Sequence, residues 1–293
     1  MNLTISNLTK TYSNGVRALN DISLTIPSGM FGLLGPNGAG KSSLMRTIAT
    51  LQDPDGGSIM LDGLDVLKNK EEVRKVLGYL PQEFGVYPKV SAEEMLDHMA
   101  VLKGISNSKQ RKETVAALLN QTNLFEARKR KLGTYSGGMK QRFGIAQALL
   151  GNPKLVIVDE PTAGLDPAER NRFLNLLSEI GENIVIILST HIVEDVSDLC
   201  RNMAIIYKGN LLLIDDPLHA IEVIKGTIWQ KTIEKHELPA YQEKYNVIFS
   251  RLFAGKTIIH VANPNSPGEG FELVSPDLRD VYFTSIQNHL KKQ

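Results

Sequence analysis

The sequence predicts an α/β fold built on a parallel β-sheet, and two features of the chain lead to this prediction. The first is a glycine-rich stretch at residues 35–42, which lies between a short apolar run of strand length and an amphipathic segment of helical period. The second is a pair of continuous apolar runs, residues 155–158 and 184–188, each followed by polar side chains. Such runs are typical of parallel strands that are buried on both faces of a sheet.

The composition predicts an ordinary folded protein. The chain has 293 residues, 42% of them hydrophobic, and 33 basic residues against 32 acidic ones give a formal net charge of +1. No global field therefore attracts the chain to nucleic acid or to an anionic membrane. The single cysteine, Cys200, forms no intrachain disulfide, and the first residues lack the pattern of a signal peptide, which favours the cytoplasm. The apolar runs are far shorter than the ~18 residues of a membrane span.

The first part of the chain predicts antiparallel strands. Apolar residues alternate between positions 3 and 26, and Asn14-Gly15 indicates a hairpin turn between two strands. Tyr12 lies just before this turn, where its ring can either stack on a nucleobase or pack across the strands.

Residues 35–42, Gly-Pro-Asn-Gly-Ala-Gly-Lys-Ser, match the phosphate-loop pattern G-x-x-x-x-G-K-[ST]. In this pattern backbone N–H groups surround phosphate oxygens, Lys41 reaches the terminal phosphates, and the Ser42 hydroxyl is a ligand for Mg²⁺. An apolar stripe, Leu44, Ile48 and Leu51, predicts the helix that follows the loop. The stretch therefore predicts a site for a nucleoside triphosphate, and a chance match to the pattern is the alternative.

The middle of the chain continues the sheet and then becomes helical. Residues 59–61 alternate up to a turn at Asp62-Gly63, and residues 76–80 form another short apolar run. Gln82 follows this run, where its amide reaches either Mg²⁺ and the attacking water or only solvent. An apolar loop after it is either a docking patch or a local cluster, and it contains Phe84, Tyr87 and Pro88. Two helical stripes follow, formed by Met95, Leu96, Met99 and Leu102 and by Val115, Leu118 and Leu119.

A second helix N-terminus suited to an anion follows a basic run at residues 128–131, which we interpret as a solvated face. Ser136, Gly137 and Gly138 precede the new helix, so the Ser136 hydroxyl either contacts an anion or simply caps the helix.

Asp159, Glu160 and His191 each follow one of the two buried strands. Ligands of an open parallel sheet bind outside the carboxyl ends of its strands, so these side chains and the phosphate loop are expected at one edge. One carboxylate holds Mg²⁺, the next orients or deprotonates water, and the imidazole contacts the γ-phosphate.

The order of these motifs resembles the nucleotide-binding domain of ATP-binding cassette (ABC) transporters over residues 1–225. The resemblance implies a P-loop NTPase fold of the ABC type, with an antiparallel β subdomain and a helical subdomain at about residues 84–150. It implies that ATP and Mg²⁺ are bound. The phosphate loop of the family corresponds here to Gly35, Pro36, Asn37, Gly38, Ala39, Gly40, Lys41, Ser42 and Ser43. The other roles that the resemblance implies are adenine stacking by Tyr12, sensing of the metal and of the membrane subunit by Gln82, the signature loop at Ser136, Gly137, Gly138 and Met139, Mg²⁺ binding by Asp159, water activation by Glu160, linkage of the two sites by Asp166, and γ-phosphate contact by His191.

The resemblance also implies partners. In this family the signature loop of one subunit faces the nucleotide of another, so we expect a head-to-tail homodimer, or a pair with a close paralogue, and no nucleic acid. Separate integral membrane permease subunits would hold the chain at the cytoplasmic face of the membrane. Two positions depart from the family pattern, with Tyr135 where leucine is usual and Met139 where glutamine is common. The motifs look most similar to ABC-2 type exporters.

Residues 226–293 predict a small α+β accessory domain. Short alternating strands include Val247, Phe249, Thr257, Ile259 and Val261, a loop follows at residues 263–268, and residues 278–283 are typical of an amphipathic helix. Trp229 is expected to be buried there. Three alternatives for the whole chain are a soluble ABC ATPase acting on nucleic acid or ribosomes, a kinase, and a module that binds ATP without hydrolysis.

Overall fold

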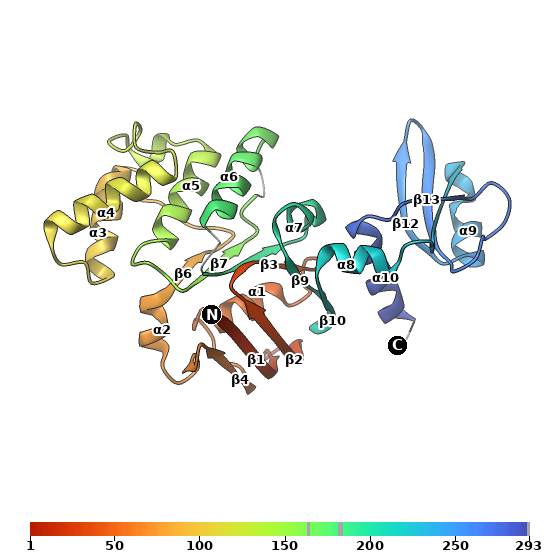
Figure 1. Ribbon diagram of the computed structural model, residues 1–293, viewed down its shortest axis with the longest axis horizontal. Helices are drawn as coiled ribbons and strands as arrows, with labels where there is room; N and C mark the ends of the chain where they lie inside the picture. Colours follow the sequence, from red (N-terminus) through yellow and green to blue (C-terminus); the bar gives the residue numbers. More distant parts are fainter. Residues whose placement is uncertain (163–164, 181–183, 292–293) are drawn as a thin grey trace.

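The computed structural model describes residues 1–162, 165–180 and 184–291, and their strands form three β-sheets. A six-stranded sheet lies at the centre, a four-stranded antiparallel sheet lies below it, and a second four-stranded sheet lies at the C-terminal end of the molecule (Figure 1).

The first antiparallel sheet contains the N-terminal strands in the order β2-β1-β4-β5. Its strands are β1 (Asn2–Thr11), β2 (Arg17–Pro27), β4 (Gly56–Leu61) and β5 (Leu64–Asp65). The predicted hairpin turns are confirmed: Gly15 has a φ of 82° between β1 and β2, and Asp62 and Gly63 have φ of 46° and 84° between β4 and β5. In the second turn, the two successive residues with positive φ match the right-handed twist of the flanking strands.

The central sheet is mostly parallel, in the order β10-β9-β3-β8-β7-β6, and only β10 runs antiparallel to its neighbour. Its strands are β3 (Gly29–Leu34), β6 (Leu77–Leu80), β7 (Leu155–Asp159), β8 (Val185–Thr190), β9 (Asn202–Tyr207) and β10 (Asn210–Asp215). The carboxyl ends of β3, β7 and β8 therefore meet at one edge, because their register pairs Leu34 with Thr190 and Asp159 with Ser189.

Both faces of the central sheet are buried, as the apolar runs predict. On β7, Leu155 and Ile157 belong to the apolar cluster that the central sheet shares with the N-terminal antiparallel sheet and with α1 (Lys41–Ile48). Val156 and Val158 join the cluster formed with the helices of the opposite face. Adjacent residues of a strand point to opposite faces, so a strand buried on both faces needs apolar residues at every position.

The remaining helices of this part are α2 (Lys70–Val76), α3 (Ala92–Leu102), α4 (Ser108–Gln121), η1 (Leu132–Thr134), α5 (Gly137–Ala148), α6 (Pro167–Ile180), α7 (Val193–Leu199) and α8 (Pro217–Val223). Two predicted stripe positions are wrong. Leu51 is 61% exposed because α1 ends at Ile48, and Leu102 is 76% exposed because the buried face of α3 is formed by Ala92, Leu96 and Ala100.

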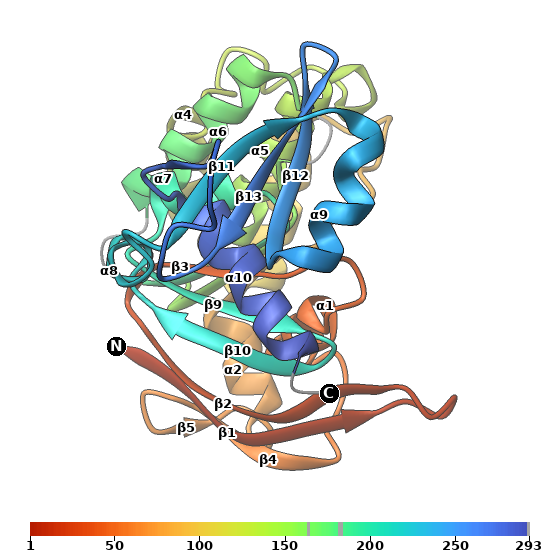
Figure 2. The same ribbon diagram turned by 90° about the vertical axis from the view of Figure 1, so that its right-hand side faces the viewer.

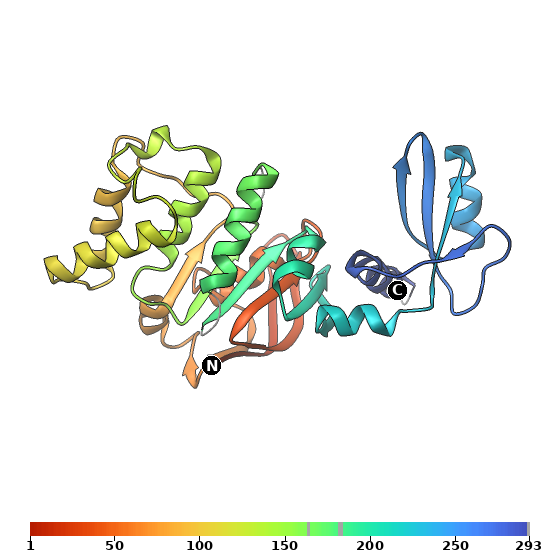
Figure 3. The same ribbon diagram turned by 45° about the horizontal axis from the view of Figure 1, so that its top comes forward.

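The C-terminal residues form a third sheet in the order β12-β13-β11-β14. Its elements are β11 (Ile228–Ile233), η2 (Lys235–Glu237), α9 (Leu238–Lys244), β12 (Val247–Phe253), β13 (Lys256–Ala262), β14 (Glu272–Leu273) and the final helix α10 (Leu278–Leu290). Trp229 is half-buried and its indole N–H donates to the Asn263 carbonyl. Figures 1 and 3 show this sheet standing apart from the core, with α10 lying between the two, and Figure 2 views β11, β13 and β12 side by side in front of the core. The division at residues 225 and 226 stays a prediction.

Helix α10 contacts both parts of the molecule. It packs against α7, α8, β9 and β10 of the core and against β12 of the third sheet. Among the described residues, no helix combines the length and hydropathy that crossing a bilayer requires.

Candidate nucleotide site

The glycine-rich loop forms the turn between β3 and α1. Gly38 and Gly40 have φ of 78° and 110°, which glycine adopts at little cost. A Cβ on Gly40 would come within 2.5 Å of the Ala18 carbonyl oxygen, so this position has no room for a side chain. Lys41 is the first residue of α1, and its Nζ donates to the Gly35 carbonyl at 2.6 Å.

A pocket of about 480 Å³ lies over this loop. Its lining contains most of the predicted binding residues, namely Tyr12, Pro36, Asn37, Gly38, Ala39, Gly40, Lys41, Ser42, Ser43, Gln82 and Glu160. It also contains four residues that the sequence analysis missed, Val16, Arg17, Ala18 and Lys208. Lys208 follows the carboxyl end of β9 in a Lys-Gly turn, with φ of 46° and 76°, and its place after a parallel strand is the signal that would have found it.

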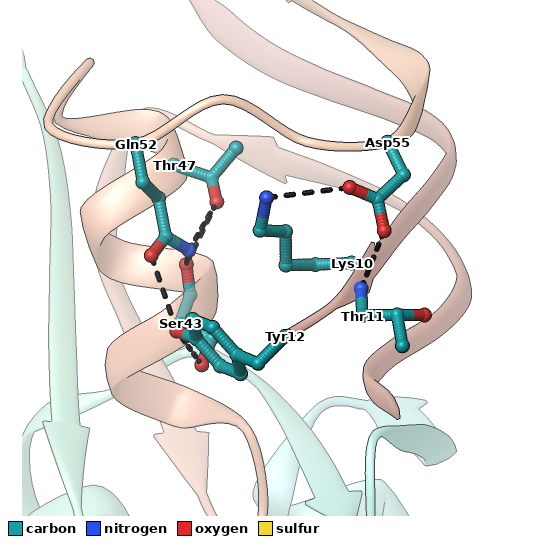
Figure 4. Close-up of polar contacts among 7 residues, drawn as sticks. All are labelled: Lys10, Thr11, Tyr12, Ser43, Thr47, Gln52 and Asp55. Carbon is teal, nitrogen blue, oxygen red and sulfur yellow. Dashed lines mark hydrogen bonds and ion pairs between the residues drawn. The ribbon is translucent and has the colours of Figure 1, made fainter. Parts of the chain in front are cut away.

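Hydrogen bonds hold the Tyr12 side chain against α1 (Figure 4). Its hydroxyl lies 2.9 Å from Ser43 Oγ and donates to Gln52 Oε1 at 3.1 Å. Gln52 Nε2 in turn donates to the Ser43 carbonyl at 2.8 Å, so the Tyr12 ring is fixed at the edge of the pocket.

Asp55 fixes the end of β1 beside Tyr12 (Figure 4). It accepts hydrogen bonds from the Thr11 backbone N–H at 2.5 Å and from Lys10 Nζ at 3.3 Å. The Thr11 N–H is the largest of the influences that hold the pKa of Asp55 below its ordinary value. The strand end that carries Tyr12 is therefore anchored on both sides.

Glu160 connects the phosphate loop to the end of β8. Its Oε1 lies 3.3 Å from Lys41 Nζ, and its Oε2 lies 3.0 Å from His191 Nδ1. Glu160 and Lys41 are buried, at 7% and 4% exposed, whereas the His191 side chain is 47% exposed. Glu160 itself has a φ of 47°, which re-aims its side chain toward the loop at the end of β7.

Asp159 supplies a carboxylate without a full set of partners. It is 4% exposed, and within the described part of the chain its Oδ1 has no hydrogen-bond partner. Burial, and next the charge of Asp159, raises the pKa of Tyr79, while Arg46 opposes the shift. A buried oxygen without a partner is costly unless a ligand satisfies it, so Asp159 fits a cation. The described residues contain no cluster of three or more side chains that would hold a metal alone.

The structure does not bring the signature residues to this pocket. Ser136 caps α5, because its Oγ accepts a hydrogen bond from the Met139 N–H at 3.2 Å, and none of residues 136–139 lines the pocket of the same chain. Asp166 likewise caps α6, accepting from the Glu169 N–H at 2.8 Å. Tyr135, which departs from the family pattern, is buried and its hydroxyl donates to the Ala127 carbonyl, so this ring is part of the helical core.

Comparison with known proteins decides the family. A family model described as ABC transporter matches residues 19–163. The linearmycin resistance ATP-binding protein LnrL of Bacillus subtilis (strain 168) is 35% identical over 234 residues, which cover 79% of this chain and 75% of LnrL. The chain belongs to the ABC transporter family. This confirms the resemblance read from the motifs.

Further ABC transporter relatives differ in length. The probable multidrug ABC transporter ATP-binding protein YbhF of Escherichia coli (strain K12) is 38% identical over 211 residues, which cover 71% of this chain and only 36% of YbhF. The daunorubicin/doxorubicin resistance ATP-binding protein DrrA of Streptomyces peucetius is 37% identical over 209 residues, covering 71% of this chain and 63% of DrrA.

Solved ABC structures confirm the predicted fold. A dimeric post-hydrolysis state of the ATP-binding cassette MJ0796, bound to ADP and Pi, superposes with a TM-score of 0.66 at 25% identity and covers 73% of this chain and 98% of that cassette. The ABC transporter subunit cbiO1 from Clostridium perfringens superposes with a TM-score of 0.68 at 28% identity, covering 75% of this chain and 90% of cbiO1.

Proposed function

We propose that this ABC chain is the ATP-hydrolysing subunit of an export-type transporter, and that it acts as a pair of chains. The observation that carries the proposal is that Lys41 and Glu160 line one pocket over a phosphate loop, while His191 lies 3.0 Å from the Glu160 carboxylate. Relatives whose names state drug or antibiotic resistance support the export direction. An ATPase that acts on nucleic acid is not favoured by these relatives or by the net charge of +1.

In this proposal each side chain has a separate task. Backbone N–H groups of the loop and Lys41 Nζ bind the β- and γ-phosphates, where they stabilise the charge that develops during transfer. Glu160 accepts a proton from the attacking water, and its burial beside Lys41 keeps the carboxylate in place. His191 positions Glu160 through Nδ1 and contacts the γ-phosphate side of the site. Tyr12 presents its ring to the adenine.

Ser42, Gln82 and Asp159 are the residues that we propose for Mg²⁺. A hydroxyl, an amide oxygen and a carboxylate are hard oxygen donors, and the unpartnered Asp159 Oδ1 supports the assignment. A bound Mg²⁺ would neutralise charge on the β- and γ-phosphates.

The pair of chains is proposed to be head-to-tail. Ser136, Gly137, Gly138 and Met139 form a helix N-terminus that does not line the nucleotide pocket of its own chain, and such an N-terminus favours an anion. A twofold axis would place this turn against the γ-phosphate held by the other chain, and Asp166 beside the contact between the two sites. The dimeric form of the MJ0796 cassette supports this arrangement.

The experiment that tests both parts mixes two inactive variants. Lys41→Ala removes the phosphate-binding lysine, and Ser136→Ala removes the hydroxyl of the turn, so each pure protein has two defective sites. In a mixed head-to-tail pair, one site contains the native Lys41 and the native Ser136. We expect about a quarter of the native ATPase rate after mixing equal amounts, because half of the pairs are mixed and each has one of two sites intact.

The outcome separates this model from its alternatives. A mixture that stays as inactive as its components would contradict the shared site, because Ser136 would then act on the nucleotide of its own chain. Mixing Lys41→Ala with Glu160→Gln is the matched control, since both residues serve the same pocket and both variants leave Ser136 intact. In a mixed pair of these two variants, one pocket lacks Lys41 and the other lacks Glu160. Both sites are therefore defective, and the ATPase rate is expected to stay low.

The export assignment also requires membrane partners. We propose that separate permease chains hold this subunit at the cytoplasmic face of the cell membrane, and that residues 226–293 form an accessory domain on the ATP-binding part at residues 1–225. Affinity isolation from the native membrane, followed by identification of the integral protein that accompanies the chain, tests this part.

A further inference from the structure

A buried carboxylate on α7 joins the segment after Glu160 to the segment after His191. Asp195 is completely buried, at 0% exposed. Its Oδ2 accepts a hydrogen bond from Thr162 Oγ1 at 2.7 Å, and its Oδ1 accepts from Arg170 Nε at 2.8 Å and lies 2.6 Å from Arg170 Nη2. Thr162 is also buried, at 3% exposed.

The place of these residues in the chain gives the contact its meaning. Thr162 lies two residues after Glu160, in the turn that follows β7, and Asp195 lies four residues after His191, in the first turn of α7. Arg170 comes from the first half of α6, which follows the Glu160 segment. One carboxylate on α7, the helix that follows His191, therefore receives hydrogen bonds from two places after Glu160: the Thr162 side chain in the turn and the Arg170 side chain on α6.

The contact is more than packing. A fully buried carboxylate is costly unless it is paired and fully hydrogen-bonded, and an apolar residue on this face of α7 would fill the same space without that requirement. A hydrogen bond to a charged group is also shorter and stronger than one between neutral groups, so it restrains the two segments relative to each other. None of the three side chains lines the nucleotide pocket, so they do not act on ATP directly.

We propose that Asp195, Thr162 and Arg170 are positioning residues for ATP hydrolysis, which hold the Glu160 carboxylate and the His191 ring at the 3.0 Å separation observed. The inference rests on the proposed roles of Glu160 and His191 and adds the device that sets their geometry. Loss of the device leaves the phosphate loop unaffected, because Lys41 and the loop are held by β3 and α1.

The test removes only the hydroxyl of Thr162. Thr162→Val keeps the shape of the side chain and leaves Asp195 Oδ2 without its donor, whereas Thr162→Ser keeps the donor. We expect Thr162→Val to lower kcat about tenfold, as a misplacement of catalytic groups does, with KM for ATP within about twofold of native. Thr162→Ser is expected to restore kcat to within about twofold of native. Thr162→Ala repeats the test should the valine variant fail to fold.

Thr122→Val is the matched control. Thr122 is another fully buried threonine, and its hydroxyl donates to the Leu118 carbonyl at 2.8 Å within the helical part. The control loses a buried threonine hydrogen bond whose acceptor is a backbone carbonyl of α4 and not Asp195, so its kcat is expected to match native while its melting temperature falls.

A second readout separates positioning from general stability. In the His191→Ala background, Thr162→Val is expected to lower kcat less than about twofold, because residues that act as a unit are not additive. An unchanged kcat in Thr162→Val, or a further tenfold loss in the His191→Ala background, would overturn the inference. Full activity of both Glu160→Gln and His191→Ala would overturn the proposed function as well, so the two failures are distinguishable.

Discussion

At the scale of single residues, Glu160 combines a strained backbone with contacts to both Lys41 and His191. Its φ of 47° is rare for a residue with a side chain and costs on the order of 1–3 kcal/mol, which the surroundings must offset. The Glu160 N–H donates to the Ser189 carbonyl at 2.8 Å, so the ladder between β7 and β8 continues through the strained residue. The strain places the carboxylate between Lys41 and His191.

Glu160→Gln is therefore predicted to separate binding from hydrolysis. The amide has the same shape and fits the same backbone, but it cannot accept a proton from water. We expect kcat to fall at least about 100-fold, with ATP affinity retained and the closed pair of chains trapped in ATP. Steady-state ATPase rates and gel filtration with ATP measure the two effects. Glu113→Gln, at an exposed position of α4, is the control, and native turnover in Glu160→Gln would count against its role as base.

Sequence reasoning found the residues of the pocket that belong to short local patterns. Residues Gly35–Ser42 match the phosphate-loop motif, and their place between a strand and a helix predicted phosphate binding. Glu160 and His191 were expected nearby because the carboxyl ends of parallel strands lie at the same edge of a sheet. Arg17 was not found, since no local pattern marks it on β2, and Lys208 was not found because the strand before it, β9, was not predicted from the sequence. The Asp195 contact was also missed, because an acid near a helix N-terminus is usually exposed.

At the scale of elements, β6 and α5 pack so closely that one glycine is required. A Cβ on Gly78 would lie 2.0 Å from the Ala148 carbonyl oxygen, which is backbone at the end of α5 and cannot rotate away. Backbone of the strand and backbone of the helix therefore meet directly. Helix α5, which begins at the signature loop, is thus fixed to the central sheet at its C-terminal end.

Gly78→Ala is predicted to destabilise the chain by about 1–3 kcal/mol, because overpacking forces the strand or the helix to move. The free energy of unfolding in urea measures the effect. Gly85→Ala is the control, since a Cβ there meets no atom within 4 Å and its φ is not positive. Equal stability of the two variants would show that α5 shifts without cost.

Elements were predicted from sequence where an apolar period marks them. The buried strands, the stripe of Val115, Leu118 and Leu119, and the hairpin turns were correct. Helix α2 was missed because Val73 is its only buried residue, so it has no apolar stripe to detect. The length of α10 beyond the expected residues 278–283 was missed for a similar reason, since its later turns are only half-buried.

At the scale of the whole molecule, α10 joins the C-terminal sheet to the core. Arg279 forms an ion pair with Glu194 of α7, and its guanidinium carbon lies 5.5 Å from the centre of the Phe249 ring on β12. Burial acts to raise the pKa of Glu194, but the Glu194 backbone N–H and Arg279 together hold it below its ordinary value. One arginine thus contacts both bodies.

The ion pair is predicted to contribute little to stability. The two side chains are 34% and 52% exposed, so a double-mutant cycle of Arg279→Met and Glu194→Gln should give a coupling energy below about 1 kcal/mol at pH 7. Because the folded pKa of Glu194 lies below the ordinary 4.5, this coupling is present above pH 4.5 and lost as pH falls through the folded value. Urea unfolding of the four proteins of the cycle at pH 7, and again below the folded pKa of Glu194, measures the coupling energy. A coupling of several kcal/mol would show instead that the pair is the main joint between the bodies.

The position of α10 has a consequence for synthesis of the chain. Leu278, Val281 and Tyr282 belong to the same apolar cluster as residues of α7 and α8, although some 50 residues of another sheet separate them in sequence from α8. A ribosome adds about 5–20 residues per second, so this side of the core stays uncovered for several seconds after α8 has emerged. Until α10 has been synthesised, the nascent chain exposes this apolar surface, which chaperones bind. A truncated messenger RNA would give a product that exposes the same surface throughout its lifetime.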